Sequence, residues 1–246
     1  MNRVHFVIVF VSVAVAMSAS AQVIGEASSA DVRQNFRELS LRSFEVGLSP
    51  GGNFSPLASN TFATPFNVSR VLLSAILRQD NTLLYFDYSV GNIDGFPEAV
   101  TFGSGGAKFD VDIAFWPPAP NVLRPIIPLS VVADLLFVST RQERGSDNIS
   151  LGSLGIGAGV GLAYSTRTSL FVAKAEAFIA FGTQGFSPVT GLVSGVITDA
   201  TFHLPQFFGA FGMAFTYRFR YTTSSFSTTQ YNYLFRAHTL TAGITF

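Results

Sequence analysis

The chain has 246 residues, a formal net charge of zero, only 12% charged residues and a mean hydropathy of +0.39. Ordinary globular chains carry roughly 25% charged residues, so this composition is too apolar for a typical water-exposed surface. The balanced charge gives no basic field that would gather phosphates, which excludes nucleic acid as an expected partner. The absence of cysteine excludes disulfide frameworks, cysteine metal sites and thiol nucleophiles.

Residues 1–21 have the pattern of a cleaved secretory signal. Arg3 precedes an apolar run over 4–17, and residues 19–21 read Ala-Ser-Ala, a small-x-small cleavage site. The alternative is a retained membrane anchor, but the run is shorter than the ~20 residues that a spanning helix needs. We therefore expect a signal over 1–21, a polar lead-in segment over 22–39 and one domain over 40–246.

After residue 40 the hydrophobic period changes to two, which predicts strands. In "KFDVDIAF", for example, Phe109 and Val111 share one face while Lys108 and Asp110 share the other. Most segments approach or exceed the 9–11 residues of a tilted membrane-spanning strand. The ten predicted strands are 41–48, 69–78, 82–91, 105–116, 126–139, 150–164, 169–182, 191–204, 207–221 and 230–246.

The connections between these segments alternate between longer and mostly shorter ones. The longer are 49–68, 92–104, 140–149, 183–190 and 222–229; the shorter are 79–81, 117–125, 165–168 and 205–206. The proline-rich 117–125 is an exception on the short side, and Pro128 suggests that the fifth strand begins near Leu129. "GSGG" at 103–106 is interpreted as a turn.

Aromatic residues gather near the predicted strand ends, as two interfacial girdles would require. Near the shorter connections lie Phe115, Trp116, Tyr164, Phe171, Phe202, Phe207 and Phe246; near the longer ones lie Phe181, Phe219, Tyr221, Tyr231 and Tyr233. The alternative is core packing in a soluble sandwich, which explains the number of rings but not their positions.

Together these features resemble a small bacterial outer-membrane β-barrel, of the OmpA/OmpX-like or Bacteroidetes type, at the level of pattern. The last segment, "TLTAGITF", alternates Leu240, Ala242, Ile244 and Phe246 with threonine and glycine, and is similar to the sorting signal read by the barrel-assembly machinery. The resemblance implies an all-β, closed antiparallel up-and-down transmembrane barrel in the outer membrane of a Gram-negative cell, with 22–39 in the periplasm. We expect ten strands, or eight if the first pair is misassigned.

The positions opposite the expected lipid face carry thirteen charged residues. They are Glu45, Arg70, Arg78, Asp87, Lys108, Asp110, Asp112, Asp134, Lys174, Glu176, Asp199, Arg218 and Arg220. In a narrow barrel such a set favours a paired, hydrogen-bonded interior. The alternative is a selectivity lining for a small solute, as in a porin-like channel, with room made by the glycines of "LGIGAGVGLAY".

The sequence offers little for catalysis or metal binding. Asp199 and His203 have the spacing of a base with its orienting group, but no serine stands out as a nucleophile. Asp110 and Asp112, or Asp147 with Asn148 in an expected loop, supply too few oxygens for calcium. We expect no metal, no cofactor and no enzymatic activity, with a lipid-modifying barrel enzyme as the remote alternative.

The sequence therefore predicts a monomeric outer-membrane barrel with a structural or surface-interaction role through its outer loops. Expected partners are outer-membrane lipid, lipopolysaccharide and, during biogenesis, the assembly machinery. A narrow channel for small solutes is the rival hypothesis.

Overall fold

A computed structural model describes residues 42–56, 72–92, 99–114, 116, 121–142, 145–166, 168–185, 189–208 and 211–246. The predicted signal (1–21) and lead-in segment (22–39) lie outside the described residues. The strands are β1 (Ser43–Pro56), β2 (Leu72–Gln79), β3 (Thr82–Asn92), β4 (Ala99–Ala114), β5 (Leu123–Gln142), β6 (Gly145–Ser165), β7 (Leu170–Gln184), β8 (Thr190–Phe208), β9 (Phe211–Phe226) and β10 (Tyr233–Thr245), with a short 3₁₀ helix, η1 (Thr229–Tyr231), before β10.

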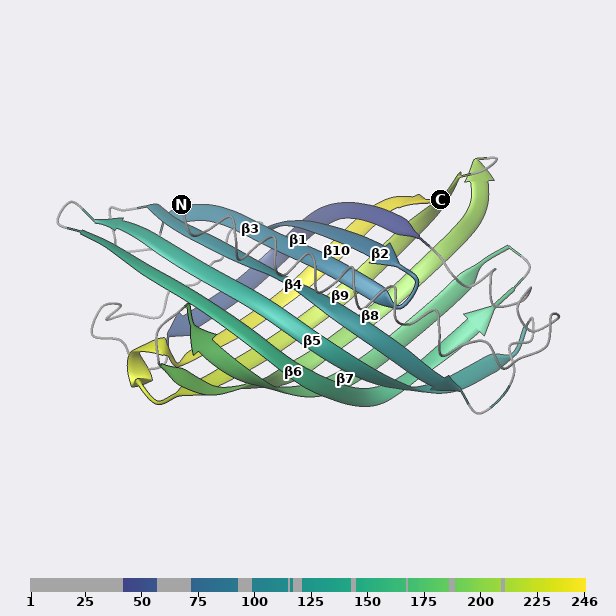
Figure 1. The fold of residues 1–246 in the computed structure, drawn as a ribbon. Helices are drawn as coiled ribbons and strands as arrows, with labels where there is room; N and C mark the ends of the chain where they lie inside the picture. The colour runs from purple at the N-terminus through teal and green to yellow at the C-terminus, as the bar shows by residue number, and fades with distance from the viewer. Residues whose placement is uncertain are drawn as a thin grey trace.

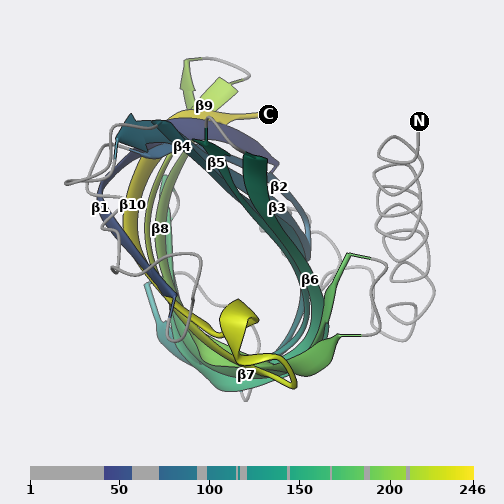
Figure 2. The ribbon, with the colours of Figure 1, turned by 90° about the vertical axis from the view of Figure 1, so that its left-hand side faces the viewer.

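The ten strands of the described residues form one closed antiparallel barrel. Figure 1 shows it from the side, and Figure 2 shows it from one end. Each strand pairs with its neighbours in sequence, and β1 closes the ring by pairing with β10. The predicted fold class and strand count are confirmed, and the eight-stranded alternative is wrong because β1 and β2 both belong to the ring. Closure gives each of these strands a paired neighbour on both sides.

The two ends of the barrel differ, and we name them by the chain termini. Ser43 pairs with Thr245, so β1 begins and β10 ends at what we call the terminal end. The connections 80–81, 115–122, 166–169 and 209–210 also lie there. The other end, the distal end, carries the connections 57–71, 93–98, 143–144, 185–189 and 227–232.

Most strands are longer than predicted, so most connections are shorter, and the expected asymmetry between the two ends holds only in part. The predicted loop 140–149 shrinks to residues 143 and 144, because β5 and β6 continue as a hairpin of 20- and 21-residue strands. Figure 1 shows this hairpin extending past its neighbours at the distal end. The connection 57–71 remains the longest, and Asp147 and Asn148 lie in β6 rather than in a loop.

Glycine and proline residues led to two wrong predictions of strand boundaries, in β4 and in β5. The "GSGG" run lies inside β4, where a side chain at Gly103 would collide with the Phe137 ring of β5. The fifth strand begins at Leu123, not near Leu129. Pro128 is accommodated because the β5–β6 pairing is interrupted between Ile126 and Leu129, where a missing N–H breaks no ladder bond.

Inner-face glycines allow the wall to curve. A methyl group at Gly159 of β6 would collide with the Ala175 carbonyl of β7, and one at Gly243 of β10 with the Phe44 carbonyl of β1. An inward side chain on a sharply curved wall leans onto the next strand, so these positions require glycine. The oval outline of the barrel is visible in Figure 2.

The outer face is apolar. Exposed side chains recur on one parity of every strand, for example Phe44 and Val46 on β1, and Leu154, Ile156 and Val160 on β6. Exposed apolar area on this scale is absent from ordinary soluble monomers. Within the described residues, no helix is long and apolar enough to cross a membrane.

Candidate functional site

The barrel interior is the candidate site, and it consists of three parts along the barrel. At the distal end lies a set of buried hydrophobic side chains, the distal apolar cluster. Next to it, toward the terminal end, lies a set of buried, paired charges around Lys108, Arg218 and Arg220, which we call the ion-pair layer. At the terminal end lies a polar cavity, the terminal cavity.

The distal apolar cluster fills the interior with side chains from every strand except β3. Its buried members are Phe54, Leu72, Val100, Phe102, Val132, Leu136, Val138, Ile149, Leu151, Phe178, Ala180, Val193, Ile197, Phe226, Tyr233, Phe235 and Ala237. Stacked rings form its centre: the Phe54 and Tyr233 centroids are 5.4 Å apart, and those of Phe102 and Phe235 are 5.2 Å apart. Offset rings at such distances attract each other beyond their burial.

A β-bulge places Phe54 in this cluster. The register between β1 and β10 shifts between Leu48 and Gly51. The extra residue moves the inward parity from odd positions such as Glu45 to even ones, so Phe54 points inside. The sequence prediction had assigned Phe54 to an outer loop.

The ion-pair layer brings together charges from six strands. Lys108 of β4 contacts Glu176 of β7 and lies 3.3 Å from Asp110. Arg218 of β9 donates from Nε to Asp199 of β8 at 2.7 Å. Since these groups are nearly fully buried, each charge depends on its partners for the solvation that water no longer supplies.

Arg220 joins the ion-pair layer to the distal apolar cluster. Its guanidinium lies 3.2 Å from Asp134 and 3.8 Å from Asp87, and it donates to the Ser104 hydroxyl at 2.9 Å. The same guanidinium lies over the Phe235 ring, 5.3 Å from its centroid. Aromatic and charged parts of the interior are therefore continuous.

Tyr85 was missed by the sequence prediction. Its ring centroid lies 4.9 Å from the Arg218 guanidinium and 4.7 Å from that of Arg220. A ring face attracts both cations and separates them. The sequence signal that could have identified it is its position: Tyr85 lies two residues before Asp87 and therefore faces the same side of β3.

Glu45 stabilises the seam where the barrel closes. Its carboxylate accepts hydrogen bonds from Ser43 Oγ at 2.9 Å and from Thr241 Oγ1 at 2.7 Å. Thr241 is one of the inward threonines of β10, so the last strand bonds to the first through side chains as well as backbone.

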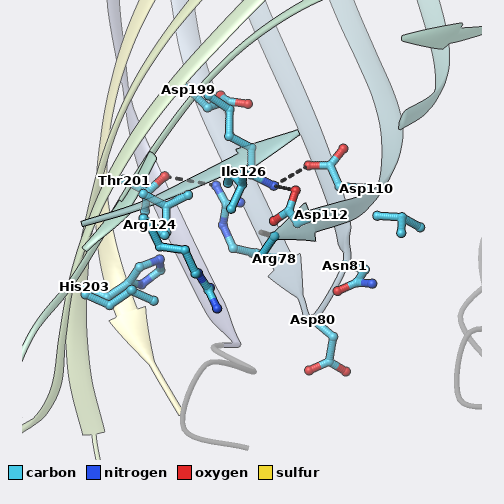
Figure 3. Close-up of a pocket in the computed structure, with 16 residues that line it drawn as sticks. Arg78, Asp80, Asn81, Asp110, Asp112, Arg124, Ile126, Asp199, Thr201 and His203 are labelled. Atoms are coloured by element: carbon cyan, nitrogen blue, oxygen red, sulfur yellow. Dashed lines mark hydrogen bonds and ion pairs between the residues drawn. The ribbon is translucent and has the colours of Figure 1, made fainter. Parts of the chain in front are cut away.

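The terminal cavity has a volume of about 380 Å³ and opens beside the β2–β3 turn. Figure 3 shows its lining, with Arg124 and His203 on one side, Asp110 and Asp112 on the other, and Arg78 between them. Lys174 neutralises the acidic side, with Nζ 3.1 Å from Asp110 and 2.8 Å from Asp112.

The structure places the predicted charged residues as follows. Arg70 lies outside the described residues. Six of them lie deep inside the barrel: Glu45, Asp87, Asp134, Glu176, Arg218 and Arg220. Lys108 and Asp199 connect the ion-pair layer to the terminal cavity. The cavity itself is lined by Arg78, Asp110, Asp112 and Lys174. Arg124 was missed, because the sequence prediction had placed it in a turn although it shares the inward parity of Ile126 and Ser130.

Asp199 and His203 both line the terminal cavity, but no hydrogen bond joins them in the described part of the chain. Asp199 is occupied by Arg218 and Lys108, and the buried His203 Nδ1 has no hydrogen-bond partner within the described segments. The predicted base with its orienting group is therefore not assembled. His238 lies on the outer face, bound through Nδ1 to the Tyr217 hydroxyl at 2.8 Å.

Among the described residues, no three His, Asp or Glu side chains lie close enough together to hold a metal ion. The acidic pair Asp110 and Asp112 is instead bridged by Lys174. An ammonium group occupies the place between the carboxylates.

The outer positions of the last strand match their predicted parity. Leu240, Ala242, Ile244 and Phe246 are exposed on the outside, whereas Thr239, Thr241 and Thr245 are buried inside. Trp116, Tyr164, Phe171 and Phe202 are likewise exposed near the terminal end. Tyr233 was wrongly assigned to the outer girdle: it is buried in the distal apolar cluster.

An antiparallel up-and-down barrel with an apolar outside and buried apolar and charged side chains inside is the class that the fold and the interior define. Its strand pattern is that of transmembrane barrels. No family model matches the sequence, and no curated protein matches it. Among solved structures, the chain is similar to the outer membrane protease OmpT from Escherichia coli, with 8% identity, a TM-score of 0.38, and coverage of 83% of this chain and 96% of that one. A similarity this low carries no functional argument, and nothing in it favours the OmpA/OmpX-like or Bacteroidetes type.

Proposed function

We propose that the protein is an integral outer-membrane barrel with a closed interior, whose role is structural or surface-interacting. The observation that carries this proposal is the inversion of the usual polarity: large apolar side chains cover the outside, while Lys108, Glu176 and Arg218 are buried inside. Lipid is the solvent that suits such an outside, and a closed barrel satisfies every ladder bond within it.

In this proposal the terminal end faces the periplasm and the distal end faces outward. Outer-membrane barrels have both chain ends on the periplasmic side, and Ser43 and Thr245 meet at the terminal end. The β5–β6 hairpin would then project outward, since its strands far exceed the 9–11 residues that cross the bilayer. The hairpin and the 57–71 connection are the proposed contact surface for lipopolysaccharide or a surface partner.

The filled interior favours a scaffold over a channel. The distal apolar cluster and the ion-pair layer both lie across the route through the barrel, and neither offers a continuous row of solvated groups. The channel alternative is supported by the terminal cavity, which would be its inner vestibule. The lipid-modifying enzyme alternative has no comparable support.

Membrane fractionation and gel mobility test the proposal. The protein expressed with its own signal should sediment with the outer membrane, require detergent for extraction, give a β circular-dichroism spectrum and migrate differently before and after boiling. A chain that stays soluble and monomeric without detergent would contradict it.

The last strand has a proposed second role as the signal for the assembly machinery. Phe246→Asp should lower the amount of assembled barrel severalfold, whereas Phe171→Asp, an exposed ring on another strand at the same end, serves as the control. The measurement is the heat-modifiable fraction in isolated membranes. Equal losses for both variants would mean that only the outer ring of aromatics matters.

A further inference from the structure

The terminal cavity contains polar groups that no other part of the described chain satisfies. Nε of Arg78, Nη1 of Arg124 and Nδ1 of His203 are buried and have no hydrogen-bond partner among the described residues. Arg78 donates a hydrogen bond from Nη2 to Thr201 Oγ1 at 3.2 Å. All three side chains line the same cavity, and His203 is only 3% exposed.

Four carboxylates also line the cavity: Asp80 stands in the β2–β3 turn, and the other three are held by other cations. Asp110 and Asp112 are bound by Lys174, and Asp199 is bound by Arg218 and Lys108. Asp112 attracts Arg124 and Asp199 attracts Arg78 at longer range, but neither Arg78 nor Arg124 forms an ion pair with any described residue. A partly buried guanidinium without a counterion is costly, unlike the paired charges deeper in the barrel.

We propose that the terminal cavity binds a small oxyanion, a single phosphate or carboxylate group, between Arg78, Arg124 and His203. The two guanidinium groups supply charge and planar N–H donors. The His203 Nδ1 and the Thr201 hydroxyl, which also line the cavity, are available as neutral donors. The volume of about 380 Å³ lies within the ~300–1,000 Å³ of ordinary ligand pockets.

The cavity also has the right access for such a ligand. Asp80 and Asn81 of the β2–β3 turn stand at its mouth, as Figure 3 shows. The ion-pair layer closes its inner side, so a ligand enters and leaves from the terminal end. This inference goes beyond the proposed function, since a closed scaffold needs no ligand there and a channel would need passage rather than retention.

The two histidines outside the predicted signal provide a direct readout. The full chain, labelled with ¹⁵N in its histidine rings and refolded in detergent micelles, is titrated with inorganic phosphate and, separately, with acetate at constant ionic strength. His203 lines the cavity, whereas His238 lies on the outer face. The His203 resonances, assigned with His203→Gln, should shift saturably with at least one anion, and those of His238 should not.

Arg124→Gln and Arg42→Gln form a matched pair of variants. Both remove one positive charge at the terminal end, but Arg124 lines the cavity, whereas Arg42, just before β1, is exposed outside that lining. Arg124→Gln should weaken binding at least tenfold and Arg42→Gln less than about threefold. Saturation with phosphate alone assigns the site to phosphate compounds, and saturation with acetate as well extends it to carboxylates.

Three results would overturn the proposal: no saturable shift of His203 with either anion, equal shifts of His203 and His238, or equal weakening by the two variants. The last would mean that the general positive field, rather than a built site, attracts the anion. None of these results depends on whether the barrel conducts ions or where it resides, so the proposed function stands or falls separately.

Discussion

The distal and terminal halves of the interior are made by the same strands but hold together differently. On β4 the inward positions change from Phe102 at the distal side to Lys108 and Asp110 toward the terminal end. On β7 they change from Phe178 to Lys174 in the same direction. The distal half depends on ring packing and the terminal half on charge pairing, with one continuous backbone ladder around both.

Only the terminal half, with its buried charges, requires a specific set of partner side chains. Apolar burial is roughly proportional to area and tolerates several shapes. A buried charge is stable only with its partners, and the same charge without them is destabilising. The terminal half, which contains the unsatisfied cations, is therefore the half that accommodates a ligand.

The largest effect is expected in the distal half. Phe102→Ala removes a ring that is 1% exposed and packed on Phe54 and Phe235, and should lower the free energy of unfolding by about 3–5 kcal/mol. Phe86→Ala, whose ring is exposed outside, is the control and should cost less in detergent. Urea unfolding in micelles measures both, and equal losses would contradict a packed distal interior.

A comparable loss is expected when a buried charge loses its partner. Lys108→Met leaves Glu176 without its cation and should cost about 3–5 kcal/mol. The double variant Lys108→Met/Glu176→Met should cost clearly less than the sum of the single changes, because each removes the other's unpaired charge. Strict additivity in the same unfolding assay would show that the two groups are not coupled.

A smaller effect is expected where the curved wall requires glycine. Gly159→Ala inserts a methyl group against the Ala175 carbonyl, whereas at Gly152 of the same strand the nearest atom to a new methyl group is a Leu135 side-chain carbon 3.5 Å away. Gly159→Ala should cost about 1–3 kcal/mol and Gly152→Ala within about 0.5 kcal/mol. Similar values for both would remove the curvature explanation.

The smallest effect is expected in the terminal cavity. Arg124→Gln removes a cation without an ion pair to any described residue, so in ligand-free buffer its unfolding free energy should change by less than about 1 kcal/mol. Lys174→Gln, which breaks contacts with Asp110 and Asp112, should cost more. A larger loss for Arg124→Gln would mean that Arg124 stabilises the fold itself.

The ten strands were predictable because, in a barrel that is apolar outside and polar inside, apolar and polar residues alternate along each strand with a period of two. Their ends were not predictable from local signals. Gly103–Gly106 and Pro128 terminate isolated strands, but here the Phe137 ring covers one of the glycines and an interrupted ladder accepts the proline. Antiparallel neighbours on both sides override local preference.

The inward face of the charged residues followed from parity, whereas their partners did not. Lys108 meets Glu176 across 68 positions of sequence, a contact set by barrel closure and stagger, which no local pattern encodes. The distal apolar cluster was hidden because the β5 segment "VVADLLFV" is apolar on both faces apart from Asp134, so parity gave little contrast there. Phe54 was hidden by the bulge, which reverses parity within one strand.

The most direct test of the closed interior is conductance after reconstitution into a planar lipid bilayer. A barrel filled by the distal apolar cluster and the ion-pair layer should give no reproducible conductance steps, and Lys174→Glu should leave it silent. Stable unitary steps in the wild type whose ion selectivity changes in Lys174→Glu would contradict the closed interior and establish the channel.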